Sequence, residues 1–168
     1  MQRHTLKIFN TEKDVINKCL LEGDLWLERN KSIYSLLTVD YNILRWNDWL
    51  SHPQYVLKRE LMTELYSNND SYKEAVNFTI HEYLTRIKNR EYLDFDKNHA
   101  FNCCLEYLLE ECAVMCLWAH EGFDFELYPT GRNLAMKVAY EIVVKKEYPG
   151  KLISVSLHFR KIYNKATT

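Results

Sequence analysis

The sequence has 168 residues, with 22 basic and 23 acidic side chains and a net charge of −1. This length suits one domain with a substantial core, which we assign to residues 1–168. The balanced charge excludes a protein that binds nucleic acid through bulk positive charge, so any such contact must be local. No apolar run is long enough to cross a bilayer, and the first residues lack the apolar stretch of a signal peptide.

The five cysteines indicate a reducing compartment. Four of them lie on one apolar segment that reads as a helix, where neighbouring residues are poor disulfide partners. No set of cysteines and histidines has the spacing of a metal site. We therefore expect free thiols in a cytoplasmic protein, with no metal ligands and no membrane partner.

The first part of the chain alternates strands and helices. Residues 5–9 predict a strand, 11–30 a helix, 41–46 a second strand and 53–66 a second helix. Gly23 weakens the middle of the first of these helices.

The second part continues the alternation. The expected elements are a helix over 70–88, a charged loop over 89–97, a long helix over 98–119, a strand over 123–127, a helix over 132–146 and a strand over 152–163. Strands separated by helices predict an α/β domain with a mainly parallel sheet, in which ligands bind at the C-terminal ends of strands. Tyr128 occupies such an end.

The helix over 98–119 is apolar almost throughout, so its polar residues are informative. Asn102, Glu106 and Glu110 recur every four residues and form one solvated stripe. Glu111 instead falls on an otherwise apolar row: Ala100, Cys104, Tyr107, Glu111, Met115 and Trp118. A buried carboxylate is costly unless a partner stabilises it. Two interpretations stay open, a functional carboxylate beside Tyr107 or a structural one paired with a Lys or Arg from elsewhere.

Three motifs in order resemble the tRNA-dependent cyclodipeptide synthases. Tyr107 and Glu111 match the Tyr-x-x-x-Glu motif that this family carries on a long apolar helix. Tyr128 followed by Pro129 is similar to the second motif of the Tyr-Pro subfamily. The segment 45–55 is similar to the stretch that precedes the helix in family members, and the likeness runs from about residue 2 to residue 160.

The resemblance implies a Rossmann-type sheet with helices on both faces, like the catalytic domain of class I aminoacyl-tRNA synthetases. It implies an enzyme that takes two aminoacyl-tRNAs, moves the first aminoacyl group onto a serine, joins the second and releases a diketopiperazine. No cofactor is implied, because the tRNA ester is already activated. Glu111 and Tyr107 would hold the α-amino group, and Tyr128 with Pro129 would position the intermediate for proton transfer.

The nucleophilic serine of the family stands in a Gly-x-Ser turn, which the 168 residues do not contain. We expect that about one strand–helix unit and this serine are supplied by a longer form or by a partner. The cationic residues that best suit tRNA phosphates are C-terminal, although a soluble tail is equally consistent with them: Lys145, Lys146, Arg160 and Lys161.

Three functional interpretations follow. The first, which we favour, is an aminoacyltransferase that makes cyclic dipeptides, or a shortened relative of one. The second is a non-catalytic protein that binds aminoacyl-tRNA or its acceptor stem. The third is a protein-interaction module that reuses the fold, and Glu111 argues against it because such a module needs no carboxylate on a buried row.

Overall fold

A computed structural model describes residues 12–36, 38, 40–91, 96–127 and 131–155 of the chain. Its elements in chain order are α2 Glu12–Tyr34, α3 Trp46–Leu50, α4 Tyr55–Asn68, α5 Asp70–Glu91, α6 Lys97–His120, β1 Phe125–Glu126, α7 Leu134–Ala139, the π-helix η1 Tyr140–Val144, α8 Lys145–Glu147 and β2 Ile153–Ser154.

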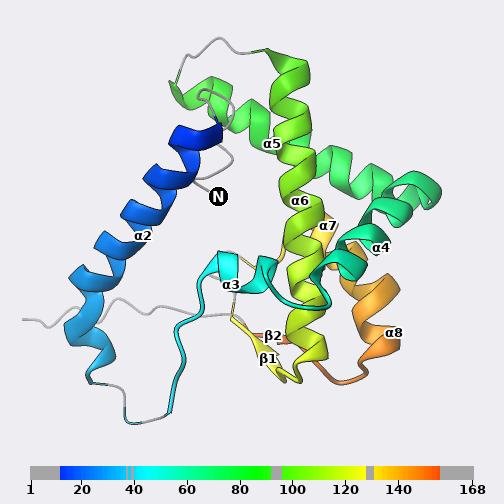
Figure 1. The fold of residues 1–168 in the computed structure, drawn as a ribbon. Helices are drawn as coiled ribbons and strands as arrows, with labels where there is room; N and C mark the ends of the chain where they lie inside the picture. Colours follow the sequence, from blue (N-terminus) through cyan, green and yellow to red (C-terminus); the bar gives the residue numbers. More distant parts are fainter. Residues whose placement is uncertain (1–11, 37, 39, 92–95, 128–130, 156–168) are drawn as a thin grey trace, which may run out of the picture.

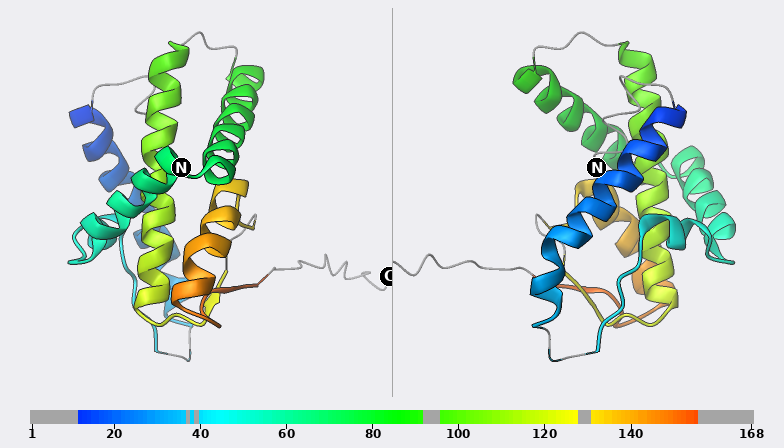
Figure 2. Two further views of the ribbon diagram at one scale, coloured as in Figure 1. Left: turned by 90° about the vertical axis from the view of Figure 1, so that its right-hand side faces the viewer. Right: turned by 60° about the vertical axis from the view of Figure 1, so that its left-hand side comes forward.

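Helix α6 is the centre of the fold. It runs through the middle of Figure 1, and the left view of Figure 2 shows α4 on one side of it and α5 and α7 on the other. Asp96 caps its first turn, accepting hydrogen bonds from the backbone N–H of Asn98 (2.8 Å) and of His99 (3.1 Å). Nearly every residue from Leu108 to Ala119 is buried. The predicted long buried helix is therefore confirmed.

The sheet of the described residues is small and parallel. Strands β1 and β2 pair with Phe125 opposite Ile153, and the helices α7, η1 and α8 form the connection between them. Leu152, which directly precedes β2, is buried in the hydrophobic core. The chain is thus an α/β protein rich in helix, as the alternation of elements predicted.

The strand predicted over 41–46 is wrong. Residues 41–45 are extended but pair with no strand in the described part of the chain, and α3 begins at Trp46. Arg45 is instead the N-cap residue of α3, and its backbone N–H donates to the carboxylate of Asp48 (2.6 Å). The predicted strands over 5–9 and beyond residue 155 lie outside the described residues.

The helix predicted over 132–146 is continuous but not uniform. The observed helix begins at Leu134 and ends at Glu147; its first six residues form α7, the next five form the π-helix η1, and the last three form α8. Val143 and Val144, which are adjacent in sequence, are both buried within the π-helix. Tyr140 lies at its start and donates a hydrogen bond to the carbonyl of Lys151 (3.1 Å).

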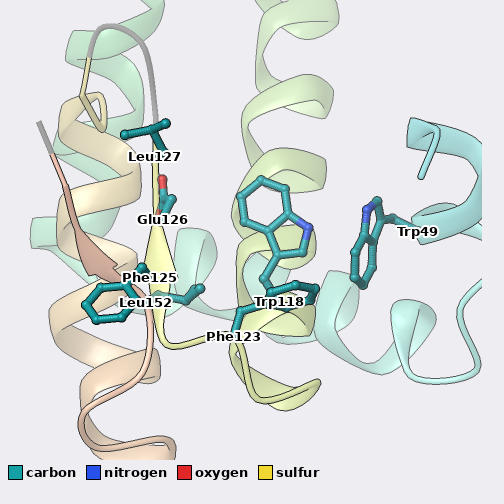
Figure 3. A pocket seen from close by; sticks show the side chains of 7 residues that line it. All are labelled: Trp49, Trp118, Phe123, Phe125, Glu126, Leu127 and Leu152. Carbon is teal, nitrogen blue, oxygen red and sulfur yellow. The ribbon is translucent and has the colours of Figure 1, made fainter. Parts of the chain in front are cut away.

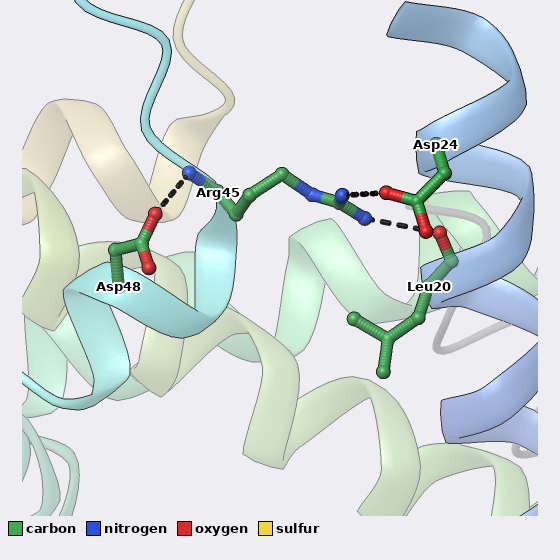
Figure 4. A network of polar contacts seen from close by, with 4 residues as sticks. All are labelled: Leu20, Asp24, Arg45 and Asp48. Carbon is green, nitrogen blue, oxygen red and sulfur yellow. Dashed lines mark hydrogen bonds and ion pairs between the residues drawn. The ribbon is translucent and has the colours of Figure 1, made fainter.

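Helix α2 is tied to α3 through Arg45, whose guanidinium reaches across to it (Figure 4). It forms an ion pair with Asp24 and donates to the carbonyl of Leu20 (3.0 Å). A Cβ atom on Gly23 would overlap the guanidinium. The glycine that the sequence marks as a weak point of this helix is therefore what allows Arg45 to approach the helix backbone.

Candidate functional site

The carboxylate of Glu111 is buried and hydrogen bonded at both oxygens. The side chain is on α6, and the residue is 3% exposed. Its Oε1 accepts a hydrogen bond from the phenol of Tyr107 (2.8 Å), and its Oε2 accepts one from the amide Nδ2 of Asn133 (3.1 Å). The burial predicted from the apolar row is confirmed, and Tyr107 contacts the same carboxylate as predicted from its position one turn earlier.

Asn133 is a site residue that the sequence analysis missed. It is the N-cap of α7, where its Oδ1 accepts from the backbone N–H of Met136 (2.9 Å) while its Nδ2 donates to Glu111. One amide therefore fixes both the start of α7 and the orientation of the carboxylate. The signal available in the sequence was an asparagine directly before a helical apolar pattern, which is typical of an N-cap.

Both of these donors are neutral, which affects what the carboxylate can do. The phenol and the amide stabilise the carboxylate through hydrogen bonds. A ligand with an ammonium group would gain a charge-assisted hydrogen bond from such a carboxylate. The geometry is thus compatible with the functional interpretation of Glu111.

The other predicted site residues are placed only in part. Tyr128 and Pro129 lie between β1 and Gly131, outside the described residues. Arg160 and Lys161 follow the last described residue, Val155. Lys145 is exposed and pairs with Glu141 one turn earlier (2.7 Å), and Lys146 is exposed too. A surface pair of this kind contributes little to stability, so Lys145 can exchange Glu141 for another anion.

A cavity of about 230 Å³ lies beside β1. Figure 3 shows Trp118 of α6 between Trp49 of α3 and the residues of the strand. The rings of Trp49 and Trp118 meet edge to face with centroids 6.3 Å apart. The cavity is lined by Trp49, Trp118, Phe123, Phe125, Glu126, Leu127 and Leu152. The sequence analysis did not predict it, because its walls come from three separate segments.

One wall of this cavity contains a buried ion pair. Glu126 is 6% exposed, and its Oε2 accepts from the guanidinium of Arg132 (2.8 Å). Arg132 also donates to the carbonyl of Leu152 and stacks on the ring of Tyr140, 3.9 Å from its centroid. The strand predicted over 123–127 is shorter in the structure, and the one buried residue of this segment is the acidic Glu126, whereas Phe125 is 65% exposed.

No family model of known protein families matches the sequence, and no curated protein matches it significantly. Solved structures that are similar to it include the following two. The first is a CDPS, or cyclodipeptide synthase, from Fluoribacter dumoffii, with 41% identity, a TM-score of 0.88, and coverage of 95% of this chain and 72% of that chain. The second is a cyclodipeptide synthase from Candidatus Glomeribacter gigasporarum bound to Phe-tRNAPhe, with 15% identity, a TM-score of 0.72, and coverage of 99% and 71%.

Within the described residues, none of the helices combines the length and the apolar composition of a membrane span.

Proposed function

The chain belongs to the cyclodipeptide synthase family, and from this premise we propose that it binds aminoacyl-tRNA and uses the aminoacyl ester to make a cyclic dipeptide. The observation that carries the proposal is the buried carboxylate of Glu111, which is oriented by Tyr107 and Asn133 on the central helix. The second similar structure is of a synthase bound to Phe-tRNAPhe, which supports aminoacyl-tRNA as the partner.

In this proposal Glu111 and Tyr107 bind the α-ammonium group of the aminoacyl moiety. A hydrogen bond between charged groups contributes roughly 1.5–3 kcal/mol, enough to separate an aminoacylated tRNA from a deacylated one. The tRNA ester supplies the activation, so a nucleophile can displace the tRNA hydroxyl without ATP.

The finer assignment is to the Tyr-Pro subfamily, through Tyr128 and Pro129. In the cyclisation step the free amine of the dipeptide attacks the carbonyl that still carries a leaving group, forms the second amide bond and loses a proton. The phenol of Tyr128 relays that proton to the leaving group. Lys145 and Lys146, with Arg160 and Lys161, contact phosphates of the tRNA.

The five free cysteines support a cytoplasmic location, and we treat residues 1–168 as one domain.

A second candidate function is aminoacyl-tRNA binding without the acyl-enzyme step. It relies on the same buried carboxylate of Glu111, held by Tyr107 and Asn133. The two functions share the proposed contact between Glu111 and the ammonium group and differ in the chemistry that follows binding.

The test of the shared step is a binding titration at fixed salt with aminoacylated and deacylated forms of one tRNA. We expect the aminoacylated form to bind more tightly, and Glu111→Gln to remove most of the difference, because the variant keeps the side-chain volume but not the charge. Glu106→Gln is the matched control, since the same change is then made on the exposed stripe of α6. Equal affinity for the two tRNAs would overturn the proposal.

The two candidate functions are separated by chemistry. A chain that makes cyclic dipeptides on its own should accumulate a covalent aminoacyl-enzyme when it is given labelled aminoacyl-tRNA, whereas a chain that only binds aminoacyl-tRNA should accumulate none. Intact-mass spectrometry checks this, and analysis of the products detects any diketopiperazine. A cyclic dipeptide made by this chain alone would show that Ser32, Ser35 or a cysteine acts as the nucleophile.

A further inference from the structure

Arg132 connects the two strands of the sheet from a position just before α7. Its Nε and Nη2 both lie 2.8 Å from Oε2 of Glu126 on β1, and it also donates to the carbonyl of Leu152, directly before β2 (Figure 3 shows both partners). Its guanidinium stacks on the ring of Tyr140, whose hydroxyl donates to the carbonyl of Lys151 (3.1 Å). The side chain is 6% exposed, so contacts with the sheet and with η1 hold it in place.

Two features around Arg132 are unfavourable in isolation. Leu152 has a φ of 52°, in the left-handed region that favours glycine, although it is a buried leucine. Oε1 of Glu126 is buried and accepts no hydrogen bond in the described part of the chain. Apolar side chains of similar volume at positions 126 and 132 would avoid the second cost. Unfavourable features that gather around one side chain indicate a function that depends on its position.

The residue that follows Arg132 orients the carboxylate of Glu111. Asn133 donates its Nδ2 to Oε2 of Glu111 (3.1 Å), and its Oδ1 caps α7 by accepting from the backbone N–H of Met136 (2.9 Å). Consecutive residues are joined by a planar peptide bond, so the anchor of Arg132 on the sheet also places the backbone of Asn133. A shift of about 1 Å there would lengthen the contact with Glu111 beyond hydrogen-bonding distance.

We propose that Arg132 is a positioning residue, which connects the sheet to the carboxylate of Glu111 through Asn133. This role rests on the proposed function, in which Glu111 binds the ammonium group of the aminoacyl moiety. Without the anchor the ammonium group meets a carboxylate whose orientation is not fixed in advance. We therefore expect loss of the anchor to lower the preference for aminoacylated over deacylated tRNA by roughly tenfold.

The first experiment needs no tRNA. The side-chain amide of Asn133 is identified in the NMR spectrum of the 168-residue chain by its absence from Asn133→Ser. Arg132→Lys keeps a positive charge beside Glu126 but loses the planar, forked donors and the stacking on Tyr140. We expect the protons of the Asn133 amide to exchange with water about tenfold faster in Arg132→Lys than in wild type. An unchanged exchange rate would overturn the proposal.

Asp124→Asn is the matched control for this measurement. It removes the exposed ion pair with Lys151, which also connects the segments of the two strands but has no link to Asn133. The exchange rate of the Asn133 amide should be the same in this variant as in wild type. A similar acceleration in both variants would show that any weakening of the sheet frees the amide, and it would overturn the specific role of Arg132.

The second experiment separates positioning from stability. Glu126→Leu combined with Arg132→Met replaces the ion pair by apolar side chains of similar size, which commonly leaves stability unchanged or raises it. A purely structural role then predicts an unaltered preference for aminoacylated tRNA. Positioning predicts that the preference falls by roughly tenfold while the affinity for deacylated tRNA stays the same. Arg132→Lys gives the same readout if the double variant does not fold, and an unaltered preference in the folded variant would overturn the proposal.

A double-mutant cycle tests whether Asn133 is the link. Arg132→Lys and Asn133→Ser should each lower the preference, and the combined variant should lower it no further than Asn133→Ser alone. Losses that multiply would show that Arg132 does not act through Asn133, and they would overturn the proposal. If the variants keep the preference of wild type, the role of Arg132 fails while the proposed function stands. If wild type itself shows no preference, the proposed function fails and the role of Arg132 in recognition fails with it.

Discussion

The phenol of Tyr107 donates a hydrogen bond of 2.8 Å to Oε1 of Glu111, one turn further along the same helix. Because both residues belong to α6, their relative position depends on the most deeply buried helix of the fold and not on a loop. Asn133 then connects the pair to α7. A ligand that binds this carboxylate would therefore meet a group whose orientation is already fixed.

Removing the phenol should weaken both stability and recognition. Tyr107→Phe takes one donor from a buried carboxylate, so we expect the free energy of unfolding in urea to fall by about 1 kcal/mol. The preference for aminoacylated tRNA should fall as well. Tyr66→Phe is the control, because it loses a hydrogen bond of similar length, 2.9 Å to Asn77, away from Glu111. An equal loss of preference in both variants would contradict the assigned role of Tyr107.

Two substitutions separate the roles of Asn133. Asn133→Ser should keep the cap of α7 but lose the donor to Glu111. Asn133→Asp should also keep the cap, but it places a second carboxylate beside the first. Protonation of one carboxylate relieves this repulsion, so the folded state of the variant binds more protons than the unfolded state. Its stability relative to wild type should therefore rise as the pH falls from about 7 to about 5, as measured by urea unfolding, and a pH-independent difference would count against the contact.

The cysteines of α6 should be protected from thiol reagents. Burial raises the pKa of Cys104 and of Cys116 to about 12, and it raises that of Cys112 too. Their reactive thiolate forms thus remain scarce even in mildly alkaline buffer. Titration of the native protein should label the half-buried Cys19 and Cys103 first, and the other three only with unfolding. Fast labelling of all five would mean that α6 opens readily.

Gly23 and Arg45 should show strong coupling in a double-mutant cycle. In an exposed helix Gly→Ala typically stabilises by roughly 1 kcal/mol. Here the added methyl group displaces the guanidinium from Asp24 and Leu20, so Gly23→Ala should give little or no gain. In an Arg45→Ala background the full gain should return. Urea unfolding of the four proteins measures the coupling, and additive effects would refute the contact.

Acid should weaken the cap of α6. The backbone N–H groups of His99 and Asn98 donate to Asp96 and hold its pKa below the ordinary 3.8. A lowered pKa in the folded state stabilises the fold above pH 3.8, and this contribution is lost as the pH falls through the folded pKa. Asp96→Asn keeps a capping oxygen without a charge. The stability difference between wild type and this variant should therefore shrink in acid, and a constant difference would show that the charge has no role.

The sequence predicted what depends on local periodicity. The apolar pattern without glycine or proline located α6, and the odd position of Glu111 on its row identified a buried carboxylate before any partner was known. Local periodicity does not predict hydrogen-bond partners that lie on other elements. Asn133 is 22 residues away in sequence and becomes a neighbour of Glu111 only because α7 packs against α6.

Two segments show why the strand predictions were inaccurate. Residues 41–45 have side chains that favour strands, yet a strand also needs a partner to complete its hydrogen bonds, and Arg45 instead caps α3. At β1 the alternation in sequence does not become an alternation in burial, because Arg132 supplies a counter-charge that keeps Glu126 buried while Asp124 and Phe125 are exposed. Neither the absent partner nor the counter-charge can be read from the segment itself.

The π-helix between α7 and α8 has a bearing on alignment and evolution. A π turn accommodates one residue more than an α turn does, so η1 is equivalent to a single-residue insertion absorbed without breaking the helix. A homologue that lacks the insertion would carry an ordinary helix there and would need a one-residue gap opposite Tyr140–Val144. Deleting one residue of that segment should therefore convert the π-helix into an ordinary α-helix, with Lys145 and Lys146 still exposed and β2 still in register with β1.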